Sequence, residues 1–289
     1  MRLQICLAAF LLPAVLCLAV VYQVPGDFAS IQPALNVCAI GDSVVVADGV
    51  YHENLVWPQV DGISLLGTSR EFTIVDGAAA GRVLVFQGSM QDPVVTSATK
   101  VRNLTLRNGF SPLNGVGVSC CFASPDIANC IIAYNSAPDW STCSGGGVYC
   151  YFSNAQFTDV LIVENSAYSG GGVHIDPVSA PQFTNCVIAD NTLVSPGGSF
   201  AAGIYTRFKV WPQFSGCTIV RNRYYASAAI HLGEVSYPTF YNCSVTDNEF
   251  GFRLVADAML TALQCNIMDN SQAGIMNTGS GLPNAQNNW

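Results

Sequence analysis

Side chains that can transfer protons or stack on flat rings recur at one position of the sequence. This position is the second residue after a corner that ends in Gly or Ala, and it holds Tyr149, His174, Tyr205 and His231. Two residues further along, Tyr151, Asp176 and Arg207 follow three of these rings. His and Asp can act as general acids or bases, Arg can neutralise an anion, and Tyr presents a flat apolar face. The chemistry depends on whether the fold brings these side chains together.

An internal repeat surrounds these positions. Five segments follow the pattern Pro-x-Phe-x-Asn-Cys-x-Ile-x-x-Asn, one of them more weakly, and a sixth has Val160 in place of Cys. Their last residues are Asn135, Asn165, Asn191, Asn222, Asn248 and Asn270, which lie 22 to 31 residues apart. Apolar and polar residues alternate in each unit, as in a β-strand, and no helical period is present. Each unit therefore carries short strands joined by turns.

Units that vary in length but keep their motifs in phase indicate a solenoid. In stacked coils, equivalent residues lie about 4.8 Å apart. We therefore expect the Asn residues to form one ladder at a corner, with amides bonding along the file. A second, interior file should contain Val160 and the repeat cysteines Cys130, Cys186, Cys217, Cys243 and Cys265.

The cysteines divide into two groups. Identically directed side chains rarely meet the torsion that a disulfide requires, so we predict that the thiols of the interior file are unpaired and pack as small hydrophobic groups. Outside that file lie Cys120, Cys121, Cys143 and Cys150. These four are better candidates for disulfides if the protein reaches an oxidising compartment.

The repeat units, together with Gly-Gly-Gly-Val-Tyr at 145–149, resemble bacterial secreted proteins with right-handed parallel β-helix repeats, of the pectin-lyase-like superfamily. Phe28 to Leu35 is similar to the amphipathic cap of such proteins, and Gly41 to Asn54 to their first coil. The resemblance covers nearly everything after residue 22. It implies an all-β, right-handed parallel β-helix solenoid of about eight or nine coils with an N-terminal cap.

A leucine-rich repeat is the alternative fold, because the spacing of Phe183, Cys186, Ile188, Asn191 and Leu193 also fits it. Leu is scarce at the key positions, however, and the rest of each unit is Gly-rich and strand-like where that fold needs a helix or an extended connection. The pattern favours the β-helix.

The motifs of pectin-active enzymes on this scaffold are absent: there is no Asp-Asp, no Gly-His-Gly and no Arg-Ile-Lys. Gly49-Val-Tyr51-His-Glu53 matches pectin methylesterases, but without their catalytic segments it indicates scaffold alone. No Cys-x-x-Cys or His-x-x-x-His spacing suggests a metal site. The resemblance is therefore specific for the fold and weak for an activity.

In stacked coils, the recurrent rings would point outward from one sheet as a strip flanked by charge. We hypothesise that Tyr149, His174, Asp176, Tyr205, Arg207 and His231 form a ligand-binding face that stacks sugar rings and bonds their hydroxyls. Two alternatives are that the rings only pack on each other, or that His174, Asp176, Tyr205 and Arg207 supply the base and neutraliser of a lyase or epimerase.

Charge and the N-terminus bear on location. The net charge is −8 and no Lys/Arg cluster occurs, which argues against nucleic acid or anionic lipid as a partner. Residues 1–19 are typical of a signal peptide, with an uncleaved membrane anchor as the alternative. Residues 20–289 would form the β-helix domain, and the sequence suggests a truncated C-terminal end because no capping element is evident before Trp289.

The sequence therefore predicts a secreted or cell-surface protein that is a non-catalytic polysaccharide-binding or adhesive and structural module. Its partner would be an extracellular polysaccharide or a surface protein, with no membrane contact after signal cleavage and no cofactor or metal. The alternative function is a lyase, hydrolase or epimerase on uronic-acid polymers. A lyase would bring Ca²⁺ as a cofactor.

Overall fold

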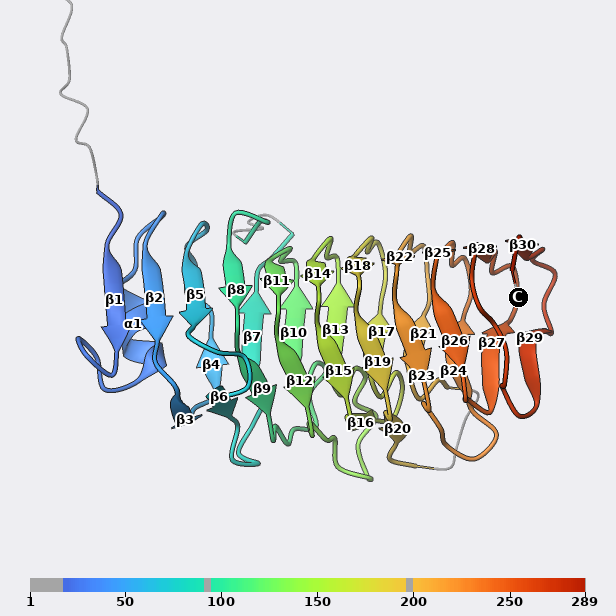
Figure 1. The fold of residues 1–289 in the computed structure, drawn as a ribbon, viewed down its shortest axis with the longest axis horizontal. Helices are drawn as coiled ribbons and strands as arrows, with labels where there is room; N and C mark the ends of the chain where they lie inside the picture. The colour runs from blue at the N-terminus through green and yellow to red at the C-terminus, as the bar shows by residue number, and fades with distance from the viewer. Residues whose placement is uncertain (1–17, 91–94, 196–199, 289) are drawn as a thin grey trace, which may run out of the picture.

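The computed structural model describes residues 18–90, 95–195 and 200–288. The chain winds along one axis as a solenoid with three long parallel sheets (Figure 1). Sheet A has eleven strands: β1 (Val21–Val24), β2 (Ser43–Val46), β5 (Ser64–Gly67), β8 (Lys100–Arg102), β11 (Asp126–Ala128), β14 (Gln156–Thr158), β18 (Gln182–Thr184), β22 (Gln213–Ser215), β25 (Thr239–Tyr241), β28 (Thr261–Leu263) and β30 (Asn284–Gln286).

The other two long sheets are built in the same way. Sheet B has eight strands: β3 (Gly49–His52), β6 (Thr73–Asp76), β9 (Thr105–Arg107), β12 (Ile131–Ala133), β15 (Leu161–Val163), β19 (Val187–Ala189), β23 (Thr218–Val220) and β26 (Ser244–Thr246). Sheet C has nine strands: β4 (Leu55–Val56), β7 (Leu84–Gln87), β10 (Val118–Cys121), β13 (Val148–Tyr151), β17 (Val173–Ile175), β21 (Ile204–Thr206), β24 (Ala228–Leu232), β27 (Phe250–Leu254) and β29 (Ala273–Asn277). A small parallel pair is formed by β16 (Ser166–Ala167) and β20 (Thr192–Leu193).

Each strand pairs with the equivalent strand one coil away, as the repeat predicts. In sheet A, for example, Phe157 lies opposite Phe183, and Phe183 opposite Phe214. The β-helix is thus confirmed, with about ten turns rather than eight or nine. The sequence underestimates the number because the coils before residue 125 lack the Cys and Asn positions that mark the later ones.

The core consists of side-chain columns that run through the coils. The rings of Phe157, Phe183, Phe214 and Phe240 stack at centroid distances of 4.7, 4.8 and 4.5 Å, with planes within 8° of parallel. This near-face-to-face geometry follows from the register, because parallel in-register strands point equivalent side chains in one direction. Its consequence is that each buried position of a coil becomes one column of equivalent side chains along the interior.

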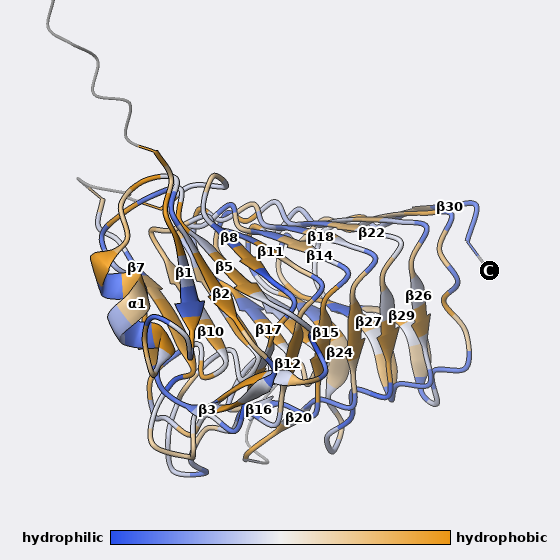
Figure 2. Cartoon of the chain, turned by 60° about the vertical axis from the view of Figure 1, so that its left-hand side comes forward, coloured by the Kyte–Doolittle hydropathy of each residue, from blue (hydrophilic) through white to orange (hydrophobic). Residues whose placement is uncertain are grey.

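The N-terminal end is covered by the helix α1 (Ile31–Val37), which lies across the first coils (Figure 2). Its residues Ile31, Ala34 and Leu35 are buried against the first coils. The carboxylate of Glu53 accepts hydrogen bonds from the backbone N–H groups of Ile31 (2.7 Å) and Gln32 (2.9 Å), which fixes the start of the helix to the first coil. The cap expected at Phe28 to Leu35 is therefore present, starting three residues later.

The corners between sheets A and B use left-handed backbone conformations. The residue after the sheet A strand has a positive φ in coil after coil, and it is Asn103, Asn129, Asp159, Asn185, Gly216 or Asn242. Asn and Asp tolerate this region better than other side chains, and Gly216 (φ 64°) has no Cβ to clash. The Asn of the repeat motif before each Cys is thus a corner residue.

One alternative from the sequence can be judged from the fold. The coils build three long parallel sheets, and α1 is the one α-helix of the described residues, so the leucine-rich repeat alternative is wrong. The predicted signal peptide, residues 1–19, lies outside the described residues except for its last two positions. From residue 18 onward, no described helix has the length and apolar character needed to cross a membrane.

Candidate functional site

The recurrent ring residues lie side by side on the outer face of sheet C. The register pairs Tyr149 with His174, His174 with Tyr205, and Tyr205 with His231. Their ring centroids are separated by 5.6, 5.0 and 4.9 Å along the file. The structure therefore brings together all four residues that the repeat places on one face.

These rings are buried, in contrast to the open strip that the sequence suggested. The exposed fractions are 6% for Tyr149, 1% for His174, 9% for Tyr205 and 3% for His231. Residues between sheets B and C contribute to the cover. The Phe200 ring lies edge-on to Tyr205 at 5.6 Å, for instance. A sugar ring therefore has no free face of this file on which to stack.

A charged cluster centred on Asp176 lies beside the rings. Its Oδ2 accepts a hydrogen bond from the Tyr149 hydroxyl at 2.7 Å, and its Oδ1 accepts one from Arg207 Nε at 2.6 Å. His174 Nε2 lies 3.3 Å from the same Oδ1, and His174 Nδ1 lies 3.1 Å from the hydroxyl of Ser169. The side chains of Tyr149, His174 and Arg207, from three neighbouring coils, thus converge on one buried carboxylate.

The cluster shifts the protonation equilibria of its members. Burial by itself would raise the pKa of Asp176, but the interactions with His174, Arg207 and Tyr149 outweigh it and hold this pKa well below its usual range. Burial and the Asp176 charge raise the pKa of Tyr149. The hydrogen bond to Asp176 raises the pKa of Arg207. At neutral pH the cluster therefore contains a carboxylate, a guanidinium and a neutral phenol.

His231 continues the file in a different environment. Arg253 lies opposite it in the next coil, and the Nδ1 of His231 and the Nε of Arg253 are both buried without a hydrogen-bond partner. Burial and the Arg253 charge lower the pKa of His231 to about 4. His231 is therefore neutral under physiological conditions.

One edge of the cluster reaches the surface. The side chain of Arg207 is 41% exposed, and its guanidinium lies 5.3 Å from the centroid of the Phe208 ring, which is itself 43% exposed. Two coils earlier, the half-buried rings of Tyr151 and Phe152 pack edge to face at 4.8 Å. We call Tyr151, Phe152, Arg207 and Phe208 the Arg207 edge.

Sequence reasoning missed Ser169 and both Phe residues of this edge. Phe152 and Phe208 directly follow outward residues that the sequence singled out, and both have positive φ (48° and 59°) at the corner after sheet C. Because both Phe residues occupy the same position of the repeat, aligning the units would have identified them. Ser169 offered none, because it belongs to a corner of variable length.

The Asn ladder runs along the corner after sheet B. Each Asn bonds the next through its side chain or backbone. For example, Asn165 Nδ2 donates to Asn191 Oδ1 at 3.1 Å, and Asn191 Nδ2 donates to Asn222 Oδ1 at 2.9 Å. The equivalent bonds continue to Asn135, Asn248 and Asn270. Every Asn of this corner therefore holds two coils together.

The repeat thiols lie in one interior file and bond backbone carbonyls of the preceding coil. Examples are Cys217 Sγ to the Phe183 carbonyl (3.4 Å) and Cys243 Sγ to the Phe214 carbonyl (3.5 Å). All ten described cysteines are free thiols, including Cys120, Cys121, Cys143 and Cys150, so the disulfides expected among these four are not formed in this structure. Cys120 and Cys150 are register partners, and parallel side chains explain why adjacency does not give the disulfide torsion.

No group of three or more His, Cys, Asp or Glu side chains in the described part of the chain is arranged to hold a metal ion.

The fold and its repeats define the class of protein. The chain belongs to the family described as the right-handed β-helix region, whose profile matches residues 61–226 and 141–289. A search of curated proteins gave no match.

Solved structures resemble the chain in fold. One is ORF18 of Geobacillus virus E2, with a TM-score of 0.59, 13% identity, 91% of this chain covered and 60% of that chain. The chain thus spans 60% of the length of the viral protein. Pectin methylesterase from carrot has a TM-score of 0.48 and 13% identity, with 94% of this chain and 85% of that chain covered. Pectin methylesterase from Aspergillus niger has a TM-score of 0.48 and 15% identity, with coverage of 94% and 89%. At these identities the likeness concerns the fold alone.

Proposed function

We propose that this protein is a secreted or cell-surface module that binds polysaccharide without cleaving it, and that the Arg207 edge contacts the ligand. The observation that carries this proposal is the fixed position of Arg207. Its guanidinium is held by the buried Asp176 carboxylate while 41% of its side chain faces solvent beside the Phe208 ring. A pre-positioned donor beside an aromatic face is suited to bonding sugar hydroxyls while the ring packs on the sugar.

The burial of the cluster indicates that His174 and Asp176 position Arg207 rather than act in catalysis. A general base must contact its substrate and hold a pKa close to the working pH. His174 and Asp176 are 1% and 4% exposed, and the pKa of Asp176 is far too low for proton abstraction. We infer that these residues orient Arg207 and stiffen sheet C.

The test is affinity electrophoresis of the full chain in gels that contain pectin, alginate, xylan or β-glucan. We expect retardation by at least one polysaccharide, and its loss in Arg207→Ala and Tyr151→Ala. Arg221→Ala is the matched control, because Arg221 also binds a carboxylate one coil away, Asp190, through Nε and Nη2. Circular dichroism would verify that each variant is folded.

Retardation that is identical in the wild type, Arg207→Ala and Tyr151→Ala would refute the assignment to this edge. If none of the four polysaccharides retards the protein, the proposal that it binds these polysaccharides is refuted.

A catalytic function is the second candidate, and one contact favours it. Ser169, His174 and Asp176 lie in a row: His174 Nδ1 is 3.1 Å from the Ser169 hydroxyl, and His174 Nε2 is 3.3 Å from the Asp176 carboxylate but makes no hydrogen bond to it. Ser169 is 3% exposed, however, so a substrate would reach it only after the cover moves. Release of unsaturated or reducing ends from pectin or alginate, with and without Ca²⁺, would decide. Activity that is lost in His174→Gln would support this candidate against the binding module.

A further inference from the structure

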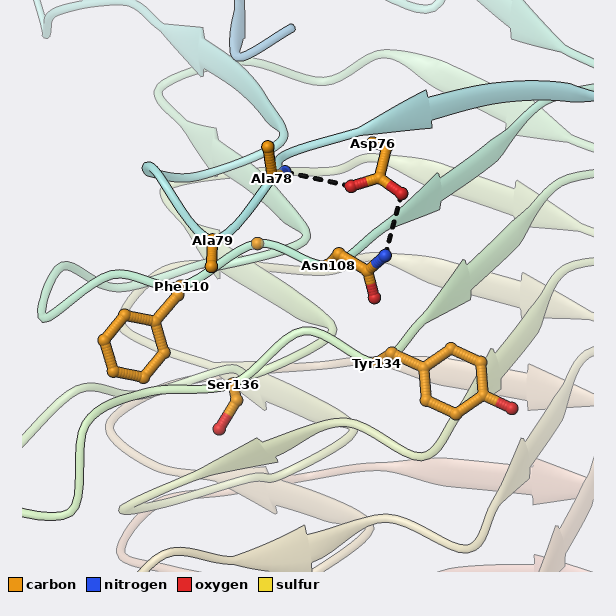
Figure 3. A pocket seen from close by; sticks show the side chains of 8 residues that line it. Asp76, Ala78, Ala79, Asn108, Phe110, Tyr134 and Ser136 are labelled. Atoms are coloured by element: carbon orange, nitrogen blue, oxygen red, sulfur yellow. Dashed lines mark hydrogen bonds between the residues drawn. The ribbon is translucent and has the colours of Figure 1, made fainter. Parts of the chain in front are cut away.

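A pocket of about 370 Å³ lies where three strands of sheet B end (Figure 3). Asp76 closes β6, Asn108 follows β9 and Tyr134 follows β12, so the pocket spans three coils. Its volume is at the small end of the range of ligand sites, roughly 300–1,000 Å³. It stays open because Ala78 and Ala79, which line it, have only methyl side chains.

The polar side of the pocket is rigidly organised. Asp76 is 5% exposed, and its Oδ1 accepts a hydrogen bond from the Ala78 N–H at 2.9 Å. Its Oδ2 accepts from Asn108 Nδ2 at 2.8 Å and from Arg107 Nε at 2.9 Å. The amide N–H of Asn108 is therefore hydrogen-bonded to Asp76, and its Oδ1 points toward the pocket (Figure 3). The pocket offers hydrogen-bond acceptors in fixed positions.

Two rings stand at the sides of this polar wall. Phe110 and Tyr134 are 44% and 52% exposed, and they lie on either side of the pocket with Ser136 below (Figure 3). The Tyr134 hydroxyl donates to Glu164 Oε1 at 3.1 Å, which restrains the ring. Apolar ring faces beside convergent polar atoms suit a ligand that has both C–H faces and hydroxyl donors.

We propose that this pocket binds one neutral pyranose unit, at a site separate from the Arg207 edge. Hydroxyls of the sugar donate to Asp76 and to Asn108 Oδ1, and a C–H face packs on Tyr134 or Phe110. Asp76 is already paired with Arg107 and requires no cation. The negative charge of Glu164 beside Tyr134 disfavours binding of the carboxylate of a uronate. The proposal of a pyranose site in this pocket does not depend on polysaccharide binding at the Arg207 edge.

The test is saturation-transfer NMR of the full chain with the methyl glycosides of glucose, galactose and mannose at millimolar concentrations. We expect transfer to at least one of them, and an affinity about tenfold lower, about 1.4 kcal/mol, in both Tyr134→Ala and Asn108→Gly. Glycine is chosen because Asn108 has a φ of 56°, which Gly adopts without strain. Tyr241→Ala is the control, because Tyr241 is 48% exposed and lies on sheet A.

Three results would overturn the proposal. They are the absence of transfer to all three glycosides, full transfer in both pocket variants, and equal or stronger binding of galacturonate. Arg207→Ala separates the two sites: it should leave the glycoside signal unchanged even if it abolishes polysaccharide retardation.

Discussion

Replacing His231 by Phe should remove an acid sensitivity from the fold. His231 is 3% exposed, stacks on the Tyr205 ring at 4.9 Å and lies opposite Arg253 in the next coil. Its Nδ1 is buried without a hydrogen-bond partner, so nothing at that atom stabilises an imidazolium. Burial and the nearby guanidinium lower the pKa from 6.5 to about 4. Protonation of His231 therefore opposes folding.

The magnitude follows from the two pKa values. In the unfolded chain His231 takes up a proton at about pH 6.5, whereas in the folded chain it resists protonation down to about pH 4. The contribution of His231 to the free energy of unfolding is fully present above pH 6.5 and is lost as the pH falls toward 4. Each pKa unit corresponds to about 1.4 kcal/mol, so the full loss is about 3 kcal/mol, and most of it is reached by about pH 4.5.

The assay is urea unfolding, followed by circular dichroism, of the wild type and His231→Phe between about pH 7.5 and pH 4.5. Carboxylates with unperturbed pKa values near 4 contribute little in this window, so the difference between the two proteins isolates His231. His52→Gln is the control, since His52 is an exposed residue of β3. Parallel pH profiles of the wild type and His231→Phe would refute the reasoning.

Three further outcomes are expected. Asn191→Ala should lower the free energy of unfolding by about 3 kcal/mol, because it leaves ladder partners on both sides without their hydrogen bonds. Asn36→Ala on the surface of α1 should change it by under about 0.5 kcal/mol. Equal effects of the two variants in urea unfolding would contradict a stabilising role of the ladder. Asp176→Asn should cost about 3 kcal/mol by leaving the Arg207 guanidinium without its ion partner, and an unchanged melting temperature would contradict this. Among the described thiols Cys121 is the one that is not fully buried, so native alkylation followed by mass spectrometry should modify it first, and early modification of Cys186 would be inconsistent with the core.

Much of the scaffold was predictable from the sequence because the repeat is explicit. A Phe, a Cys and an Asn at constant spacing in successive units leave few ways to stack, and the register of Phe183 opposite Phe214 follows. The earlier coils were harder to count. Their strands, such as β5 and β6, have no Cys–Asn pair, and only alternation marks them.

The candidate site was predictable in part. The period of two placed Tyr149, His174 and Tyr205 in one file, and the register has them there. Their burial was not predictable, because the covering Phe200 comes from a corner whose length and sequence differ from coil to coil. The same limit applies to Ser169.

By itself the sequence determined which residues are equivalent between coils, and hence the thiol file, the amide ladder and the ring file, since a repeat in the chain becomes a column in a solenoid. The tertiary structure alone decided which columns meet solvent. It buried the rings, left Arg207 at the surface, and joined Asp76, Asn108 and Tyr134 into one pocket although they share no motif. The physical reason is that in-register stacking is a local rule repeated along the axis, whereas exposure depends on how irregular corners fold over their neighbours.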